Sequence, residues 1–267
     1  MALFHTHFFS EVLRMQSEAT VILPQASTGS QIGIETAAAR KSWPCLWLLH
    51  GLSDDHTTWT RRTSIERYAE EAGCAVVMPN GHRSFYTDMK QGGKYWTYIS
   101  EELPTVMRSF FPISDRREDN AVAGLSMGGY GAAKWLLRKP DDFIAGASLS
   151  GAVDICGRMK KLMAEEPDSE TAKTLYLNFG KELPENADDD LLTQLKNTGE
   201  RKNLPALLQI CGTEDFLYDD NLLFKKTAEQ VGYPLSYLER PGEHNWAFWE
   251  EAIQDVLAWL PEQGFGR

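Results

Sequence analysis

The stretch NAVAGLSMGGYGAAKWLL, residues 120–137, places one serine between glycines, after a short apolar run and before a helical one. Its centre, Gly124 to Gly128 with Ser126 in the middle, has the pattern GxSxG, which is typical of a sharp turn from a strand into a helix. Glycine on each side avoids the collision that a Cβ would cause where the chain crosses itself. Such a turn lifts the Ser126 hydroxyl above the sheet edge, beside free N–H groups at the helix start. The stretch therefore predicts an α/β fold that presents a serine for chemistry.

Strand-like and helix-like segments alternate on both sides of this turn. Short apolar runs predict strands, and segments with apolar residues three and four apart predict helices. The first two strands show the partial alternation of an antiparallel start, whereas the later ones are continuous apolar runs, as expected of strands covered on both faces. The strand candidates are 6–15, 18–25, 44–51, 74–80, 120–126, 143–151, 206–212 and 234–242, and the helix candidates are 64–73, 98–111, 128–140, 219–232 and 245–260. The fold class is therefore α/β, with a mostly parallel sheet of the eight-stranded type and helices on both faces.

The alternation is interrupted between residues 155 and 203, after the sixth strand candidate. About fifty residues without structure are uncommon, so this segment is expected to form short helices that make a partial lid or flank. A solvated surface insertion is the alternative. Its triplet Asp188, Asp189 and Asp190 is expected to be a solvated turn or helix start rather than a metal site. No repeat or Gly/Ser-rich linker divides residues 1–267, which predicts a single domain with a cap-like insertion.

Composition narrows the classes of partner. The 267 residues are 42% hydrophobic and 24% charged, with a formal net charge of -11. Because the acidic excess is not relieved by a Lys/Arg stripe, nucleic acid is not an expected partner. The first residues do not resemble a secretion signal and no apolar run is long enough to span a bilayer, so no membrane association is expected. Four widely spaced cysteines favour reduced packing residues and a cytoplasmic location over a disulfide or metal site.

A serine hydroxyl needs a base within reach, and histidine is the usual one. In the α/β arrangement the order along the chain is nucleophile, acid, histidine. Of the six histidines only His244 follows Ser126, and it lies between the last strand candidate and the last helix candidate. His5 and His7 share a strand face, but a metal pair there lacks a third nearby ligand. His244 is therefore the predicted base.

The acid that orients His244 is expected just beyond a strand between the serine and the histidine. The loop after 206–212 supplies Glu214 and Asp215, while Asp219 and Asp220 are typical of the next helix start. Asp215 is preferred and Glu214 is the alternative. Ser150 also ends a strand, but it lacks the GxSxG frame and is set aside.

The remaining site predictions concern the donors to the oxyanion and the wall of the substrate pocket. The N–H of Met127 is one expected oxyanion donor, and the N–H of Leu52, in the loop LLHGLSDDHTTW, is the second. Aromatic residues near the site loops each fit ordinary packing, yet as a group they indicate an apolar slot. They are Trp59, Tyr86, Trp96, Tyr98 and Trp246. The candidates for the wall are Trp59, Trp96 and Trp246, with Trp246 preferred because it follows His244 closely.

Six segments together resemble the esterase D family of α/β-hydrolases, and most of all its tributyrin-esterase-like branch. They are HGLSDDHTTW, VVMPNGHRSFYTD, EELPTVMRSFFP, AGLSMGGYGAAKW, CGTEDFLY and GEHNWAFW. The resemblance runs from the first strand to the last helix. It implies an α/β-hydrolase fold and a serine carboxylesterase for short acyl esters, with Ser126, Asp215 and His244 as triad, Leu52 and Met127 as oxyanion donors, and neither metal nor organic cofactor.

The resemblance leaves the substrate open, because the family also includes S-formylglutathione hydrolases, feruloyl and acetylxylan esterases, and mycolyltransferases. A thioesterase and an acyltransferase are therefore alternative functions. A binding protein without catalysis would lack a triad member, and none is missing here. The acidic insertion departs from some relatives and leaves the acyl-pocket wall undefined. The expected partner is a small-molecule ester, and assembly into a homo-oligomer is left open.

Overall fold

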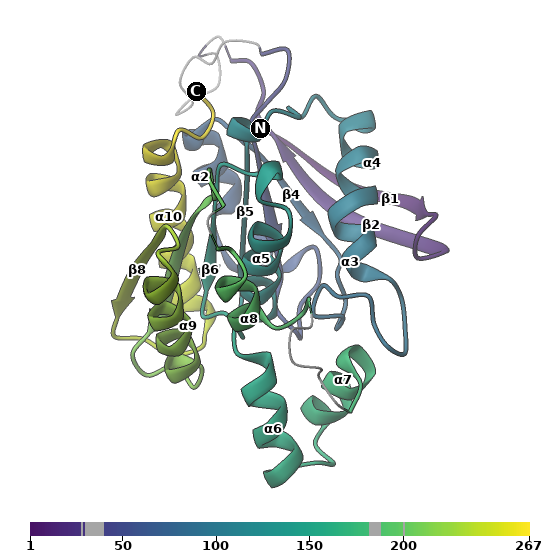
Figure 1. Cartoon of the computed structure of the whole chain (residues 1–267). Coiled ribbons are helices and arrows are strands. Elements are labelled where there is room, and N and C mark those ends of the chain that lie inside the picture. Colours follow the sequence, from purple (N-terminus) through teal and green to yellow (C-terminus); the bar gives the residue numbers. More distant parts are fainter. Residues whose placement is uncertain (28, 30–39, 182–187, 200) are drawn as a thin grey trace.

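A computed structural model describes residues 1–27, 29, 40–181, 188–199 and 201–267. Its centre is one eight-stranded sheet in the order β1-β2-β4-β3-β5-β6-β7-β8 (Figure 1). The strands are β1 (Ala2–Ser10), β2 (Met15–Leu23), β3 (Cys45–Leu49), β4 (Ala75–Pro79), β5 (Asn120–Leu125), β6 (Ala145–Leu149), β7 (Ala206–Gly212) and β8 (Leu235–Arg240). The β1–β2 and β2–β4 pairs are antiparallel and the remaining pairs are parallel. The predicted fold class is confirmed.

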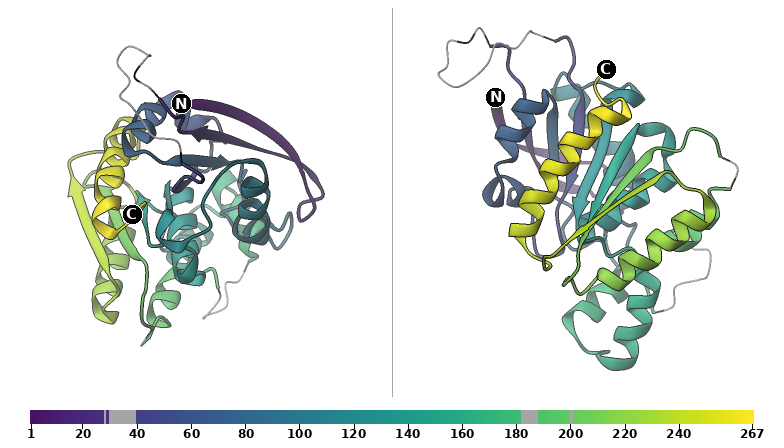
Figure 2. Two further views of the ribbon diagram at one scale, coloured as in Figure 1. Left: turned by 90° about the horizontal axis from the view of Figure 1, so that it is seen from above. Right: turned by 90° about the vertical axis from the view of Figure 1, so that its left-hand side faces the viewer.

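Helices cover both faces of the sheet because successive side chains of each buried strand point to opposite sides. In β3, Trp47 and Leu49 pack on one face, whereas Leu46 and Leu48 pack on the other. Figure 2 shows α10 crossing the second face. The first face is covered by α3 (Tyr95–Thr97), α4 (Leu103–Phe110), α5 (Met127–Arg138), α8 (Leu191–Lys196) and α9 (Tyr218–Val231), and the second by α1 (Thr58–Arg62), α2 (Ile65–Ala72) and α10 (Trp246–Trp259).

The first strand differs from its expected range. β1 ends at Ser10, and residues 11–14 form a turn. The carboxylate of Glu102 holds this turn by accepting the N–H groups of Glu11 at 2.7 Å and Val12 at 3.3 Å. Glu102 is about ninety residues away in sequence, so the apolar residues of the turn resembled a continuing strand.

The interrupted segment contains two helices that extend past one end of the sheet, on the side away from the chain termini (Figure 1). They are α6 (Ile155–Glu165) and α7 (Glu170–Phe179), and α8 follows them. Residues 182–187 and 200 of the expected 155–203 insertion lie outside the described residues. The short helices that the sequence predicted here are present.

The acidic triplet in this segment is only partly as expected. Asp190 caps α8 by accepting the N–H groups of Leu192 and Thr193, and Asp188 lies at the surface. Asp189 instead forms an ion pair with Lys134 of α5, whose side chain is fully buried. A lysine buried in the core explains the difference, since its charge requires a carboxylate nearby.

The cysteines, the groups of possible metal ligands and the length of the helices bear on the other sequence predictions. The four cysteines are free: Cys45, Cys74 and Cys211 are buried, and Cys156 is half-buried. Among the described residues, no three His, Cys, Asp or Glu side chains gather as a metal site would require. None of the helices in the described ranges is long and apolar enough to cross a bilayer.

Candidate active site

Ser126 occupies a strained turn between β5 and α5. Its φ is 53° and its ψ is -115°, a backbone conformation that residues other than glycine rarely adopt. The turn is tight enough that a Cβ on Gly124 would lie 2.4 Å from the carbonyl oxygen of Gly128, and a Cβ on Gly128 would lie 2.4 Å from that of Leu49. The Ser126 N–H donates to Leu149 O of β6 at 2.8 Å, which fixes the turn to the sheet. The two glycines and the strained conformation of Ser126 together let the chain pass from β5 directly into α5.

His244 connects Ser126 to an acid. It lies in the loop between β8 and α10, with Nε2 3.0 Å from Ser126 Oγ. Its Nδ1 lies 3.0 and 2.9 Å from the two carboxylate oxygens of Asp215. Because Nδ1 faces a carboxylate, it carries the proton of the neutral ring, which leaves Nε2 free to accept the serine proton. The structure thus brings together three residues that are far apart in the chain.

Asp215 is the buried member of this group, with a side chain closed to solvent. Burial by itself would raise its pKa, but the hydrogen bond and charge of His244 and the N–H of Leu217, at 2.8 Å, outweigh it and lower the pKa. The alternative acid, Glu214, is exposed and turns instead to Thr213 Oγ1 and the N–H of Gly242. Asp215 remains ionised and is the carboxylate that contacts His244.

Two backbone N–H groups close to the serine come from different elements. Met127 is the first residue of α5, where N–H groups have no partner within the helix. Leu52 lies in the turn after β3 and lines the same cavity as Ser126 and His244. Neither N–H donates to another group among the described residues. The arrangement offers two free donors for an oxygen that becomes negative.

His50 holds the loop that carries Leu52. Its Nδ1 lies 2.7 Å from Gly51 O and must donate, so its Nε2 accepts the N–H of Gly81 at 2.9 Å. Burial lowers the pKa of His50 to about 4, which keeps the ring neutral. Tyr86 OH donates to His50 O at 2.9 Å and ties the same two loops together. This role of His50 is not predicted from the sequence, in which the HG pair of LLHG is its only signal.

The cavity above Ser126 has a volume of about 450 Å³. Aromatic side chains form much of its wall, namely Phe85, Phe216, Trp246 and Trp249. The ring of Phe216 is 63% exposed and lies 4.4 Å from that of His244, and the guanidinium of Arg158 lies 5.0 Å from the Phe216 ring. Arg158 belongs to α6, and Thr171 of α7 also lines the cavity. The interrupted segment therefore borders the site.

Of the three expected wall residues, only Trp246 lines this cavity. Trp59 is fully buried, 5.2 Å from Trp246 at an edge-to-face angle, and donates to Leu49 O. Trp96 packs beneath Lys134 and Arg138. Both tryptophans are packing residues, which corrects the expectation for the wall. Two residues of the wall were not predicted from the sequence. Trp249 lies three residues after Trp246, and Phe216 directly follows Asp215.

Comparisons with known proteins find an esterase family and serine hydrolases among the relatives of this chain. A family model described as "Putative esterase" matches residues 21–260. The chain is 28% identical over 269 residues to an acetyl esterase of Caldicellulosiruptor saccharolyticus, covering 97% of this chain and 98% of that one. Among solved Staphylococcus aureus structures, the fluorophosphonate-binding serine hydrolase FphF matches with a TM-score of 0.85 and 34% identity, covering 97% and 98% of the two chains. The S-formylglutathione hydrolase FrmB matches with a TM-score of 0.80, 35% identity and the same coverage.

Proposed function

We propose that this chain, which belongs to the Esterase family and is a serine carboxylesterase, hydrolyses short acyl esters with Ser126 as nucleophile, His244 as base and Asp215 as orienting acid. The family match agrees with the sequence resemblance to esterase D-like enzymes. The observation that carries the residue assignment is the position of His244, within 3.0 Å of both Ser126 Oγ and the Asp215 carboxylate. This geometry is what a serine nucleophile needs.

The reaction follows from these contacts. His244 Nε2 takes the Ser126 proton as Oγ attacks the ester carbonyl, and the carbonyl electron pair moves to its oxygen. When that pair returns, the bond to the alcohol breaks and the alcohol leaves with the proton from His244. Water, deprotonated by His244, then attacks the acyl-enzyme and releases the acid and Ser126. Asp215 stays ionised and stabilises the imidazolium in both halves.

The oxyanion is proposed to bind the N–H groups of Leu52 and Met127. Both donors belong to loops that are already fixed, Leu52 through His50 and Met127 through the turn at Ser126. Donors that need not reorganise stabilise the transition state more than water can. Loss of one such donor typically costs about a hundredfold or more in rate.

A small acyl group fits the cavity. The volume of this cavity, about 450 Å³, lies toward the small end of the range for ligand sites. Aromatic rings close to His244 limit the length of the acyl chain that the cavity accepts. The similarity to an acetyl esterase supports the same size class. We infer further that residues 1–267 form one domain and that α6 and α7 act as a partial cap, since Arg158 and Thr171 border the cavity.

The test uses p-nitrophenyl acetate, p-nitrophenyl butyrate and tributyrin without added metal. Ser126→Ala is expected to lower kcat by roughly 10⁴-fold or more. A fluorophosphonate should label Ser126 in the wild type and in Ser150→Ala, the matched serine at the end of β6, but should not label Ser126→Ala. Full activity in Ser126→Ala would refute the proposed nucleophile.

Thioester hydrolysis is the second candidate, favoured by the similarity to FrmB. The same triad can attack a thioester, since the proton from His244 would leave with a thiol instead of an alcohol. The ratio of kcat/KM for S-formylglutathione to kcat/KM for p-nitrophenyl acetate decides between the two. A ratio far above one favours the thioesterase, and a ratio near or below one favours the carboxylesterase for simple esters.

A further inference from the structure

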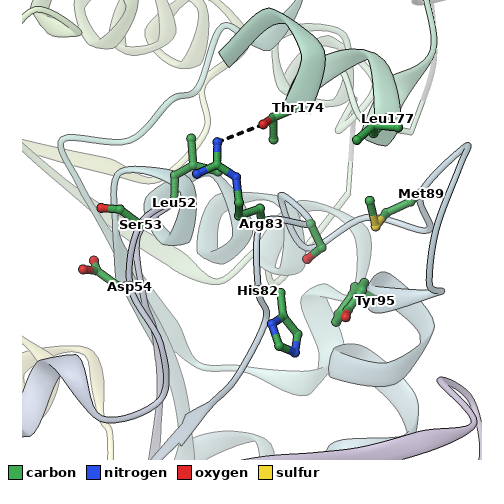
Figure 3. Close-up of a pocket in the computed structure, with 10 residues that line it drawn as sticks. Leu52, Ser53, Asp54, His82, Arg83, Met89, Tyr95, Thr174 and Leu177 are labelled. Carbon is green, nitrogen blue, oxygen red and sulfur yellow. Dashed lines mark hydrogen bonds between the residues drawn. The ribbon is translucent and has the colours of Figure 1, made fainter. Parts of the chain in front are cut away.

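A second cavity adjoins the one above Ser126. Its volume is about 560 Å³, and it shares Leu52, Ser53 and Asp54 with the catalytic cavity. The far wall comes from the loop after β4 and from α7, and includes His82, Arg83 and Thr174 (Figure 3). A substrate bound at Ser126 could therefore extend past Leu52 into this second space.

Arg83 is the permanently charged cation that lines the second cavity. One of its terminal nitrogens donates to Thr174 Oγ1 at 2.9 Å, and the rest of the guanidinium forms no ion pair among the described residues. Glu170, at the start of α7, pairs with Lys173 at 2.9 Å instead. The carboxylate of Asp54 points away from Arg83 in Figure 3 and accepts the N–H of Gly51 at 3.2 Å. Arg83 therefore keeps unused donors beside the cavity.

The loop that carries Arg83 is held in place from several sides. Asn178 Nδ2 donates to Arg83 O at 2.8 Å, and the N–H of Gly81 donates to His50. His82, Phe85 and Tyr86 have φ values of 47°, 50° and 49°. Strained backbone of this kind persists where the surroundings enforce it and is common at ligand sites. A guanidinium fixed in advance binds an anion with less loss of side-chain entropy.

We propose, resting on the esterase function above, that the second cavity binds a carboxylate that the ester substrate carries at a distance from its reacting carbonyl, with Arg83 as its partner. The planar guanidinium fork matches a carboxylate. A doubly charged phosphate usually requires more than one cation or a helix N-terminus, and Arg83 is the single permanent cation along this wall as the structure describes it. The leucine and methionine side chains of the cavity suit an apolar spacer between ester and carboxylate.

The test compares two ester pairs that each differ by one charge. Mono-p-nitrophenyl adipate and its methyl ester carry or lack the carboxylate on the acyl half. 4-Acetoxybenzoate and methyl 4-acetoxybenzoate carry or lack it on the alcohol half. For each pair the charged-to-neutral ratio of kcat/KM is measured in the wild type, Arg83→Gln and Arg83→Lys. Arg67→Gln, an exposed arginine of α2 on the other face of the sheet, is the matched control.

Arg83→Gln is expected to lower the ratio by roughly five- to tenfold in at least one pair, mainly through KM, because a remote contact is made equally in ground and transition states. Arg83→Lys should recover part of it, and Arg67→Gln should leave it unchanged. The pair that responds shows which half carries the carboxylate. An unchanged ratio in both pairs, or an equal loss on charged and neutral esters without rescue by lysine, overturns the assignment of Arg83. Absence of hydrolysis of every ester would instead overturn the proposed function.

Discussion

Asp189→Asn removes the charge that faces a fully buried lysine while keeping the shape of the side chain. Lys134 Nζ contacts the Asp189 carboxylate and donates to Tyr86 O at 3.0 Å, and Thr87 Oγ1 donates to Asp189 at 2.7 Å. Even with Asp189 present, burial lowers the pKa of Lys134 from 10.5 to about 8, so the charge of this lysine is less favourable in the core than in water. Asparagine leaves this charge without a counterion.

The expected result is a decrease of about 3 kcal/mol in the free energy of unfolding at pH 7. This is the lower end of the cost of breaking a buried pair, because a quarter of the Asp189 side chain reaches solvent. Urea unfolding followed by tryptophan fluorescence measures it. The matched control is Asp188→Asn, which removes a carboxylate that is 67% exposed and pairs with Arg138 at 2.7 Å. That surface pair should contribute less than about 1 kcal/mol.

A double variant separates the unpaired charge from other damage. Lys134→Met combined with Asp189→Asn replaces the pair by an apolar side chain of similar length beside a neutral amide. It should be more stable than Asp189→Asn alone, because no charge then remains buried. If Asp189→Asn costs no more than Asp188→Asn, or if the double variant is no more stable than the single one, the buried pair does not carry the energy assigned to it here.

Three further predictions concern the site and its loops. Asp215→Asn should lower kcat for p-nitrophenyl butyrate by about 10⁴-fold with unchanged circular dichroism, because the amide favours the wrong imidazole tautomer; a loss below tenfold would contradict the role of Asp215. The pKa of His50 is about 4 in the folded chain and about 6.5 unfolded, so up to about 3 kcal/mol of stability should disappear as pH falls from 6.5 to 4. Urea unfolding at several pH values in that range measures this. The free energy of unfolding should change less steeply with pH in His50→Gln than in the wild type. Gly128→Ala should lose more than tenfold in activity because its Cβ would meet Leu49 O, whereas Gly73→Ala, in open space, should lose stability but keep kcat.

Local signals in the sequence predicted most of the fold. Continuous apolar runs marked the buried strands, and the GxSxG turn indicated where the sheet exposes a serine. The turn after β1 was misplaced because a carboxylate from a distant helical segment, Glu102, holds it. Apolar residues in that turn have the pattern of a strand, so no local feature distinguishes the two.

Chain order selected His244, and the position early in the loop after β7 favoured Asp215, because a parallel sheet brings the carboxyl ends of its strands to one edge. The pocket wall was harder to predict. Trp59 and Trp96 lie near site loops in sequence, yet large apolar rings are drawn into the core, where both are found. Phe216 stays exposed over His244 because it directly follows Asp215 on a loop at the cavity. Whether an aromatic side chain points into the core or into the cavity depends on contacts between segments that are distant in the sequence.

The nucleophile and the segment that borders its cavity share one helix. Ser126 precedes the first residue of α5, and Lys134 follows eight residues later, about 12 Å along the axis. Through Lys134 the helix α5 holds Asp189 at the start of α8, and Tyr130 OH strengthens this contact by donating to Asp189 O at 2.8 Å. A change that releases Asp189 therefore loosens the start of α8 at residues 188–190 while the hydrogen bonds of Ser126 remain. Because the ring of Tyr130 also packs against that of Phe179 at the end of α7, such a variant should alter KM for esters that reach Thr171 or Thr174 more than the rate of acyl transfer to Ser126.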